Sequence, residues 1–307
     1  MTNTFFSKFD VHVHCAPVRT PLSSGNPTDP LSHYAADPEE IKETLLKQGI
    51  SRAVLMSGGE NISQTAHHLG AFNEDCAKIC ADHPETFLWM CNVNAERPET
   101  LAERLAACKE AGAVGVGEVM VNEWLDSPFL TALFAAAEKL RLPVLCHMSP
   151  EPGFSYGVCD RAGLPLLEEV LTRFPDLIFI GHSQPFWTEI SGGCEHLTRE
   201  ERNGFGRGPV APGGTVERLL GTYPNLYADL SAYSGSCAVL RDPVYGPAFL
   251  ERFHDRLLFG TDTLNERTVF PLGNYLDESL ARGQLSRQAY EDICRGNAER
   301  LFCHAKS

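Results

Sequence analysis

Eight short apolar runs separated by helix-like stretches constrain the fold of this chain more than any other feature of its sequence. The runs are mostly Val, Ile, Leu and Phe with little polar alternation, which is typical of strands buried on both faces of a parallel sheet. In order, the runs are Phe9–His14, Arg52–Ser57, Phe87–Asn94, Ala113–Met120, Pro143–Met148, Leu177–His182, Leu226–Leu230 and Leu257–Gly260.

The stretches between the runs carry the signals that begin and end helices. Asp37 is a good N-cap residue and precedes Pro38, so a helix is expected to begin at Pro38 and to end at Gly49. Three further helices are expected on similar grounds: Pro98–Ala111, Pro165–Phe174 and Gly213–Tyr223. The 307 residues exceed the roughly 250 that a TIM barrel needs. We therefore predict an α/β fold, a (β/α)₈ TIM barrel formed by residues 1–307 as one domain.

Two segments are too long to be ordinary connections between a strand and a helix. Cys15–Ala36 follows the first predicted strand, and Ser183–Pro212 follows the sixth. Both would lie on the face of the barrel where active sites are built. We therefore expect long loop insertions after strands one and six that shape or cover a substrate site.

Five side chains that commonly bind metals stand at the carboxyl ends of predicted strands. His12 and His14 end the first strand and share a face, because side chains two residues apart on a strand point the same way. The others are His147, His182 and Asp262, at the ends of the fifth, sixth and eighth strands. Barrel closure brings such ends together around one axis. Imidazole nitrogens and a carboxylate oxygen suit Zn²⁺ and its first-row neighbours, so the sequence predicts a divalent metal site, with Zn²⁺ the expected ion.

The order H-x-H, His, His, Asp over strands one, five, six and eight resembles the amidohydrolase superfamily. It is most similar to the amidohydrolase-related branch, which includes aminocarboxymuconate-semialdehyde decarboxylase and related decarboxylases, hydratases and hydrolases. Supporting motifs are Phe9–His14, Phe259–Asp262 and Gly296–Phe302, and the resemblance spans nearly the whole chain. It implies a metal enzyme with a metal-activated water, in which Asp262 moves protons and His182 polarises a substrate carbonyl.

Glu118 ends the fourth predicted strand, where binuclear members of the superfamily carry a carboxylated lysine or a glutamate that bridges two metals. The Gly-Glu-hydrophobic pattern here is similar to that of TatD-type metal nucleases, whereas decarboxylase members generally lack this carboxylate. Glu118 is therefore predicted to be a sixth metal ligand, with one or two ions per chain. The alternative is that Glu118 hydrogen-bonds another ligand from a second layer.

These residues predict a metal-dependent hydrolase that attacks an amide, ester or lactone-like bond of a small molecule. The alternative is a lyase, a non-oxidative decarboxylase or hydratase of a carboxylated small molecule. Arg19 and Arg207, one in each insertion, are candidates for pairing with a substrate carboxylate, although surface solvation is the commoner role of loop arginines. Phe186, Trp187 and Tyr156 either line an aromatic pocket or anchor their loops.

Charge and composition exclude several other classes. A net charge of −14, with 40 acidic against 26 basic residues and no dense basic run, argues against a nucleic-acid partner and hence against a nuclease. No apolar stretch approaches the roughly 18 residues that span a bilayer, so no membrane partner is expected. The eleven scattered cysteines and the absence of a signal-peptide pattern in Met1–Asp10 predict a cytoplasmic location. The sequence leaves the oligomeric state open, although barrels of this branch often form homodimers.

Overall fold

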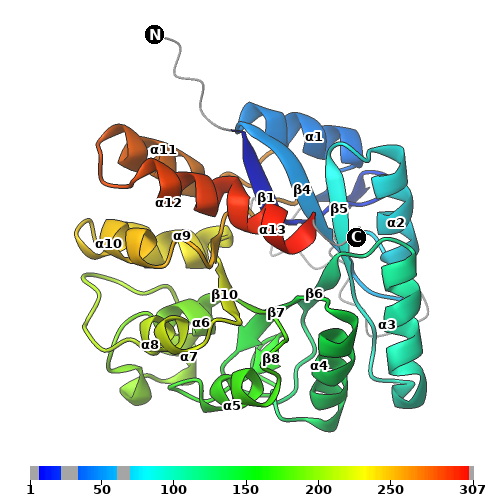
Figure 1. Ribbon diagram of the computed structural model, residues 1–307, viewed down its shortest axis with the longest axis horizontal. Coiled ribbons are helices and arrows are strands. Elements are labelled where there is room, and N and C mark those ends of the chain that lie inside the picture. Colours follow the sequence, from blue (N-terminus) through cyan, green and yellow to red (C-terminus); the bar gives the residue numbers. More distant parts are fainter. Residues whose placement is uncertain (1–6, 22–33, 61–69, 304–307) are drawn as a thin grey trace.

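A parallel β-barrel surrounded by helices forms the centre of the computed structural model, which describes residues 7–21, 34–60 and 70–303 (Figure 1). Eight strands of the described chain follow one another around the barrel in sequence order, each parallel to the next. They are β1 (Lys8–Val13), β4 (Ile50–Met56), β5 (Phe87–Cys91), β6 (Gly115–Val119), β7 (Val144–Ser149), β9 (Phe179–His182), β10 (Leu226–Asp229) and β11 (Leu257–Leu258). The predicted TIM barrel is confirmed, and each of its eight strands overlaps one of the predicted apolar runs.

The barrel closes between its first and last strands. Beyond the two residues of β11, the backbone N–H of Asp262 donates to the carbonyl of His12 at 2.8 Å, and His14 N–H donates to Thr263 at 2.8 Å. Val13 and Thr263 form a parallel bridge at the same seam. Closure therefore places the H-x-H motif next to Asp262, although 247 residues lie between His14 and Asp262 in the chain.

Most helices lie outside the strands, as Figure 1 shows. The longer ones are α1 (Pro38–Lys47), α2 (Asn73–Asp82), α3 (Leu101–Glu110), α4 (Pro128–Leu140), α5 (Pro165–Arg173), α8 (Thr215–Thr222), α9 (Ala232–Leu240), α10 (Tyr245–Arg252) and α11 (Leu272–Ala281). Asp37 caps α1 as expected, because its carboxylate accepts from the backbone N–H groups of Glu39 and Glu40. A 3₁₀ turn, Pro98–Thr100, replaces the first part of the helix expected from residue 98.

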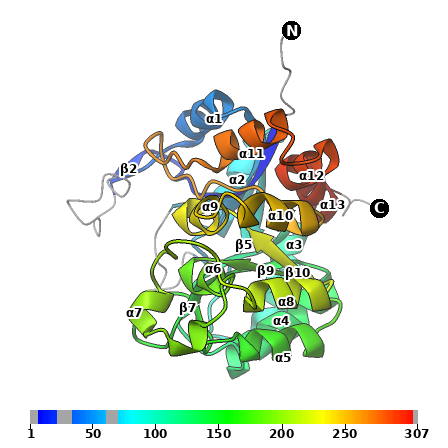
Figure 2. The ribbon, with the colours of Figure 1, turned by 90° about the vertical axis from the view of Figure 1, so that its left-hand side faces the viewer.

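The two predicted insertions differ in content. The segment after β9 contains α6 (Gln184–Thr188) and α7 (Arg199–Arg202). In Figure 2, α7 lies at the lower left edge of the molecule and α6 lies between it and α8. In the segment after β1, Thr20–Pro21 (β2) pairs antiparallel with Tyr34–Ala35 (β3). The part of that predicted insertion at 22–33 lies outside the described residues.

The interior of the barrel is a packed apolar core below the strand ends. It combines residues of the strands, such as Phe9 and Val11, with Ala298 and Phe302 of α13 (Asn297–Phe302). The short helix α12 (Arg287–Glu291) and a π-helical turn, Asp292–Gly296, lead into α13. The apolar filling occupies one end of the barrel, so polar side chains gather at the carboxyl ends of the strands. Within the described residues no helix is long and apolar enough to cross a membrane.

A bulge in β1 determines which side chains face that polar end. The pairing of β1 with β4 shifts register between Asp10 and Val13. Val11 belongs to the inner core and Val13 to the outer one, so the alternation of faces changes within the strand. As a result the side chains of Val11 and His12 both point into the barrel, although neighbouring side chains in a regular strand point to opposite faces.

Candidate metal centre

Six side chains converge at the carboxyl ends of the strands, and they are the six predicted from the sequence. His12 comes from β1, Glu118 from β6, His147 from β7 and His182 from β9. His14 directly follows β1, and Asp262 lies four positions beyond the end of β11. Their potential ligand atoms form three overlapping groups, and within each group all atoms lie within 4.8 Å of one another. The groups are His12, His14 and Glu118; His12, His182 and Asp262; and Glu118, His147 and His182.

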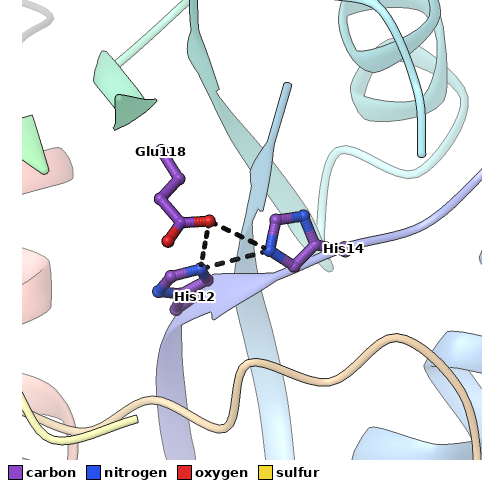
Figure 3. Close-up of side chains that lie close together, drawn as sticks. All are labelled: His12, His14 and Glu118. Carbon is purple, nitrogen blue, oxygen red and sulfur yellow. Dashed lines mark hydrogen bonds and ion pairs between the residues drawn. The ribbon is translucent and has the colours of Figure 1, made fainter. Parts of the chain in front are cut away.

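The first group surrounds a single point between β1 and β6 (Figure 3). The Nε2 atoms of His12 and His14 are 3.2 Å apart, and each lies 3.5 Å from Oε2 of Glu118. Oδ1 of Asp262 lies 3.5 Å from Nε2 of His12 and 3.2 Å from that of His14. Two ligands about 2.1 Å from one ion at tetrahedral or octahedral angles are about 3.0–3.4 Å apart. The observed spacing therefore fits a shared ion.

The other carboxylate oxygen of Glu118 faces the second pair of histidines. Oε1 lies 2.6 Å from Nδ1 of His147 and 3.7 Å from Nε2 of His182. Glu118 thus stands between the two histidine pairs, one oxygen toward each. This position fits a bridging ligand, and the 2.6 Å contact also fits the alternative in which Glu118 hydrogen-bonds His147.

Asp262 is the most exposed member of the cluster. Its side chain is 29% exposed, whereas the other five residues are buried. Its backbone has a φ of 59°, in the left-handed region that costs an L-residue energy, and its N–H bond to the His12 carbonyl fixes it there. The cluster therefore opens to solvent on the side of this carboxylate.

A second layer of polar groups, which the sequence analysis missed, orients two of the histidines. Oδ2 of Asp229 lies 2.7 Å from Nδ1 of His12 and 3.0 Å from Nδ1 of His182. Ser231 Oγ donates to the same oxygen at 2.6 Å and lies within 3.3 Å of both imidazoles. An ionised carboxylate only accepts hydrogen bonds, so both Nδ1 atoms carry protons and both Nε2 atoms face the cluster. The available signal was a carboxylate near the end of the buried run Leu226–Leu230.

Charge and burial shift the pKa values in the cluster. Burial lowers the pKa of His12, but the carboxylates of Asp262 and Glu118 outweigh it and hold the value well above the ordinary one. Burial raises the pKa of Glu118, yet His12 and His147 hold it well below its usual range. Burial likewise raises the pKa of Asp229, which hydrogen bonds from His12 and His182 then bring below its ordinary value. Buried, ionised carboxylates among imidazoles suit a bound cation.

Comparison with known proteins identifies the family of this chain. The model of a family described as amidohydrolase matches residues 9–303. The chain belongs to the amidohydrolase family. No curated protein sequence matches it.

Solved structures resemble this family member over nearly their full length. The 2,6-dihydroxybenzoate decarboxylase from Rhizobium is 19% identical with a TM-score of 0.62, covering 97% of this chain and 98% of its own. A 5-carboxyvanillate decarboxylase from Novosphingobium aromaticivorans, complexed with manganese and 4-hydroxy-3-methoxy-5-nitrobenzoic acid, is 14% identical with a TM-score of 0.65, covering 99% and 97%. An uncharacterized TIM-barrel protein from Bordetella bronchiseptica is 20% identical with a TM-score of 0.64, covering 98% and 100%. Such identities show a shared fold.

The donor set of this amidohydrolase fits a divalent metal. It offers four imidazoles, two of which have their tautomer set by Asp229, together with a buried carboxylate at Glu118 and a more exposed one at Asp262. This mixture of nitrogen and oxygen donors suits several first-row ions, among them zinc and manganese. Family membership and the donor set together support a divalent metal without selecting one.

The two arginines predicted to bind substrate lie in different surroundings. Arg19 is 53% exposed, and its Nη1 pairs with Oε1 of Glu40 at 2.8 Å while its guanidinium stacks 3.9 Å from the ring centre of Tyr34. Arg207 is exposed in the segment after β9, and its carbonyl accepts from Arg241 Nη1 at 3.4 Å. Neither belongs to the three ligand groups, and their contact with substrate stays a prediction.

The three aromatic residues noted in the sequence have different positions. Phe186 and Trp187 are buried, and Trp187 Nε1 donates to the carbonyl of Asp229 at 2.8 Å, so both anchor α6 behind the centre. Tyr156 is 42% exposed and lies on the imidazole of His147. Burial raises the pKa of the Tyr156 phenol, and the nearby charges of Glu118 and Asp262 raise it further, so the phenol is protonated at neutral pH.

Proposed function

We propose that this chain is a metal-dependent lyase, a non-oxidative decarboxylase of a small aromatic carboxylic acid. This is the alternative of the sequence analysis, preferred to hydrolysis because the structural neighbours named above with a stated activity are decarboxylases of aromatic acids. The observation that carries the proposal is the position of Asp262. It is the one partly open carboxylate of the six-residue cluster, 3.2 Å from His14, where a substrate would meet the metal.

We infer that His12, His14, His147, His182 and Asp262 hold the ion, with Glu118 beside or between them. A bound divalent ion would supply positive charge that orients a substrate oxygen and stabilises developing negative charge. Manganese or zinc fits this role, and the manganese in a structural neighbour makes manganese the first ion to test. Asp229 keeps the two imidazoles that it contacts in the tautomer that leaves Nε2 free to bind.

Asp262 would hold and deliver the proton that the reaction needs. Its carboxyl would give a proton to the ring carbon that bears the substrate carboxylate. The carbon–carbon bond then breaks, its electron pair returns to the ring, and carbon dioxide leaves, so that one proton replaces one carbon dioxide. The buried side of the centre excludes water from this exchange.

The test is a screen of manganese-loaded protein with 2,6-dihydroxybenzoate, 5-carboxyvanillate and related hydroxybenzoates, with chromatographic detection of the decarboxylated arene. Asp262→Asn is expected to slow turnover by about 100- to 10,000-fold, the range for loss of a general acid. Asp255→Asn, which alters an exposed carboxylate, is the matched control and should retain activity. Hydrolysis of esters or lactones with no loss of carbon dioxide from any acid would overturn the proposal.

A metal-dependent hydrolase is the second candidate, and the geometry of Glu118 favours it. One oxygen of Glu118 faces His12 and His14 and the other faces His147 and His182, so each histidine pair would have one carboxylate oxygen with which to hold an ion. Two such ions would supply an activated water for hydrolysis. Metal counting by mass spectrometry separates the two candidates. A fall from two ions per chain to one in Glu118→Gln would favour the hydrolase, whereas one ion in both proteins would favour the lyase.

A further inference from the structure

Tyr156 stands at the mouth of the barrel and has no part in the chemistry proposed above. It lies in the loop between β7 and β8 (Val158–Cys159), and its ring centroid is 4.3 Å from that of His147 with the planes at 37°. His147 is 7% exposed, whereas Tyr156 is 42% exposed. The tyrosine ring therefore covers the imidazole with part of its surface and presents the rest to the opening.

The backbone on both sides of Tyr156 is fixed against the barrel. Met148 of β7 pairs with Val158 in a parallel ladder, and the N–H of Gly157 donates to the Met120 carbonyl at 2.9 Å. Asn122 then ties the loop at two points, because its Nδ2 donates to the Gly157 carbonyl at 3.0 Å and its Oδ1 accepts from Gly153 at 2.6 Å. A ring on so fixed a backbone is preorganised for contact with a ligand.

Gly157 makes the close approach to His147 achievable. Its φ is +107°, which L side chains rarely adopt, and a Cβ there would lie 2.6 Å from the His147 carbonyl oxygen. The same Cβ would lie 2.8 Å from Cδ2 of the His147 ring. Glycine thus lets the loop turn directly against the imidazole, which brings the neighbouring Tyr156 ring onto it.

We propose that Tyr156 is a substrate-contacting residue that selects planar aromatic acids. The exposed part of its ring stacks on the ring of the substrate while the substrate carboxylate reaches the centre beside Asp262. This inference rests on the proposed function, since it takes the substrate to be a carboxylate bound at the barrel mouth. The competing role is that Tyr156 only anchors its loop on His147, in which case the shape of the ligand ring would not matter.

Two simple acids separate these roles without turnover. Benzoate and cyclohexanecarboxylate carry the same charge on rings of similar size, but the first is flat and the second puckered. Binding to manganese-loaded protein is measured by calorimetry or ligand-observed NMR. We expect the unaltered protein to bind benzoate about 3- to 10-fold more tightly, the range that aromatic pairing contributes beyond buried area. Tyr156→Leu should remove this preference, and Tyr156→Phe should keep it.

Tyr233→Leu is the matched control. Tyr233 is 48% exposed, close to the value for Tyr156, but its ring packs edge-on against Phe205 with centroids 4.8 Å apart. This control should retain the full preference for benzoate. Should Tyr156→Leu fail to fold, as judged by circular dichroism, Tyr156→Met serves as the non-planar replacement.

Each result bears on the proposal. A preference unchanged in Tyr156→Leu, or lost equally in Tyr233→Leu, would overturn the role of Tyr156 and leave the decarboxylase proposal standing. If neither acid bound the metal-loaded protein, the carboxylated substrate and the role of Tyr156 would both be rejected.

Discussion

Replacing Asp229 by asparagine tests how the second layer prepares the metal centre. The two oxygens of the Asp229 carboxylate have different partners. Oδ1 accepts from Ser231 N–H at 2.9 Å, whereas Oδ2 faces Nδ1 of both His12 and His182. An asparagine that keeps the bond to the Ser231 backbone must place its NH₂ group toward the imidazoles. Because this NH₂ can only donate, each Nδ1 would have to accept, and the ring proton would move to Nε2. A protonated Nε2 cannot bind a metal.

The size of the effect follows from this change of tautomer. Loss of one partner that orients a metal-binding histidine typically lowers metal affinity by about 10- to 100-fold. Because Asp229 serves two histidines at once, we expect the upper end, about 100-fold or roughly 3 kcal/mol of binding free energy. The dissociation constant for Mn²⁺ is measured by competition with a fluorescent chelator at fixed pH.

Asp10→Asn is the matched control, since Asp10 is also a buried carboxylate next to the centre. Its oxygens accept from the backbone N–H groups of His12 and Thr261 and from the Thr261 hydroxyl, not from an imidazole. Burial raises its pKa to about 7, so a neutral amide resembles a form that the protein already tolerates. Unchanged Mn²⁺ affinity in Asp229→Asn, or an equal loss in Asp10→Asn, would refute the tautomer argument.

Three further predictions concern stability. In Gly181→Ala the new Cβ would lie 2.3 Å from a ring atom of buried Phe186, so we expect a loss of about 1–3 kcal/mol in urea unfolding, whereas Gly221→Ala, with nothing within 4 Å, should cost nothing. Burial raises the pKa of Asp160 from 3.8 to about 7, so the stability that its protonated form contributes is fully present below pH 4 and is lost as the pH rises to 7. The free energy of unfolding of Asp160→Asn should therefore increase relative to that of the unaltered metal-free protein between pH 4 and pH 7. A difference that stays constant over this interval would contradict the argument. Mn²⁺ at 100 times its dissociation constant should raise the free energy of unfolding by about 2.7 kcal/mol, and a variant with alanine at both histidines of the H-x-H motif should show no such rise.

The candidate centre was predictable where its residues end buried strands. A strand covered on both faces reads as a continuous apolar run, so a polar residue that terminates the run is conspicuous. His147, His182 and Asp262 were found in this way, and Glu118 was recognised by its place at the end of the fourth run. The resemblance to the amidohydrolase superfamily then ordered these residues, and the match to the family model confirms it.

Other parts of the centre had no local signal. The register shift in β1 depends on pairing with β4, so the apolar pattern around His12 does not reveal it. Asp229 was one carboxylate among 40 acidic residues, and its role depends on two imidazoles that lie 217 and 47 positions away in the chain. The expectation of hydrolysis was also drawn from one residue, Glu118, whose two oxygens face different histidine pairs only once the barrel has closed.

The sequence by itself determined the alternation of strands and helices and the polar residues at the strand ends. Both depend on which residues are buried, and burial is visible locally in the pattern of apolar and polar residues. Only the tertiary structure decided that Asp229 orients two histidines, that Asp262 is the open side of the cluster and that Tyr156 covers His147. Those relations depend on closing the barrel and on turning one loop against a strand end. Contacts between distant segments depend on the packing of the whole barrel, so they cannot be predicted from any short stretch of sequence.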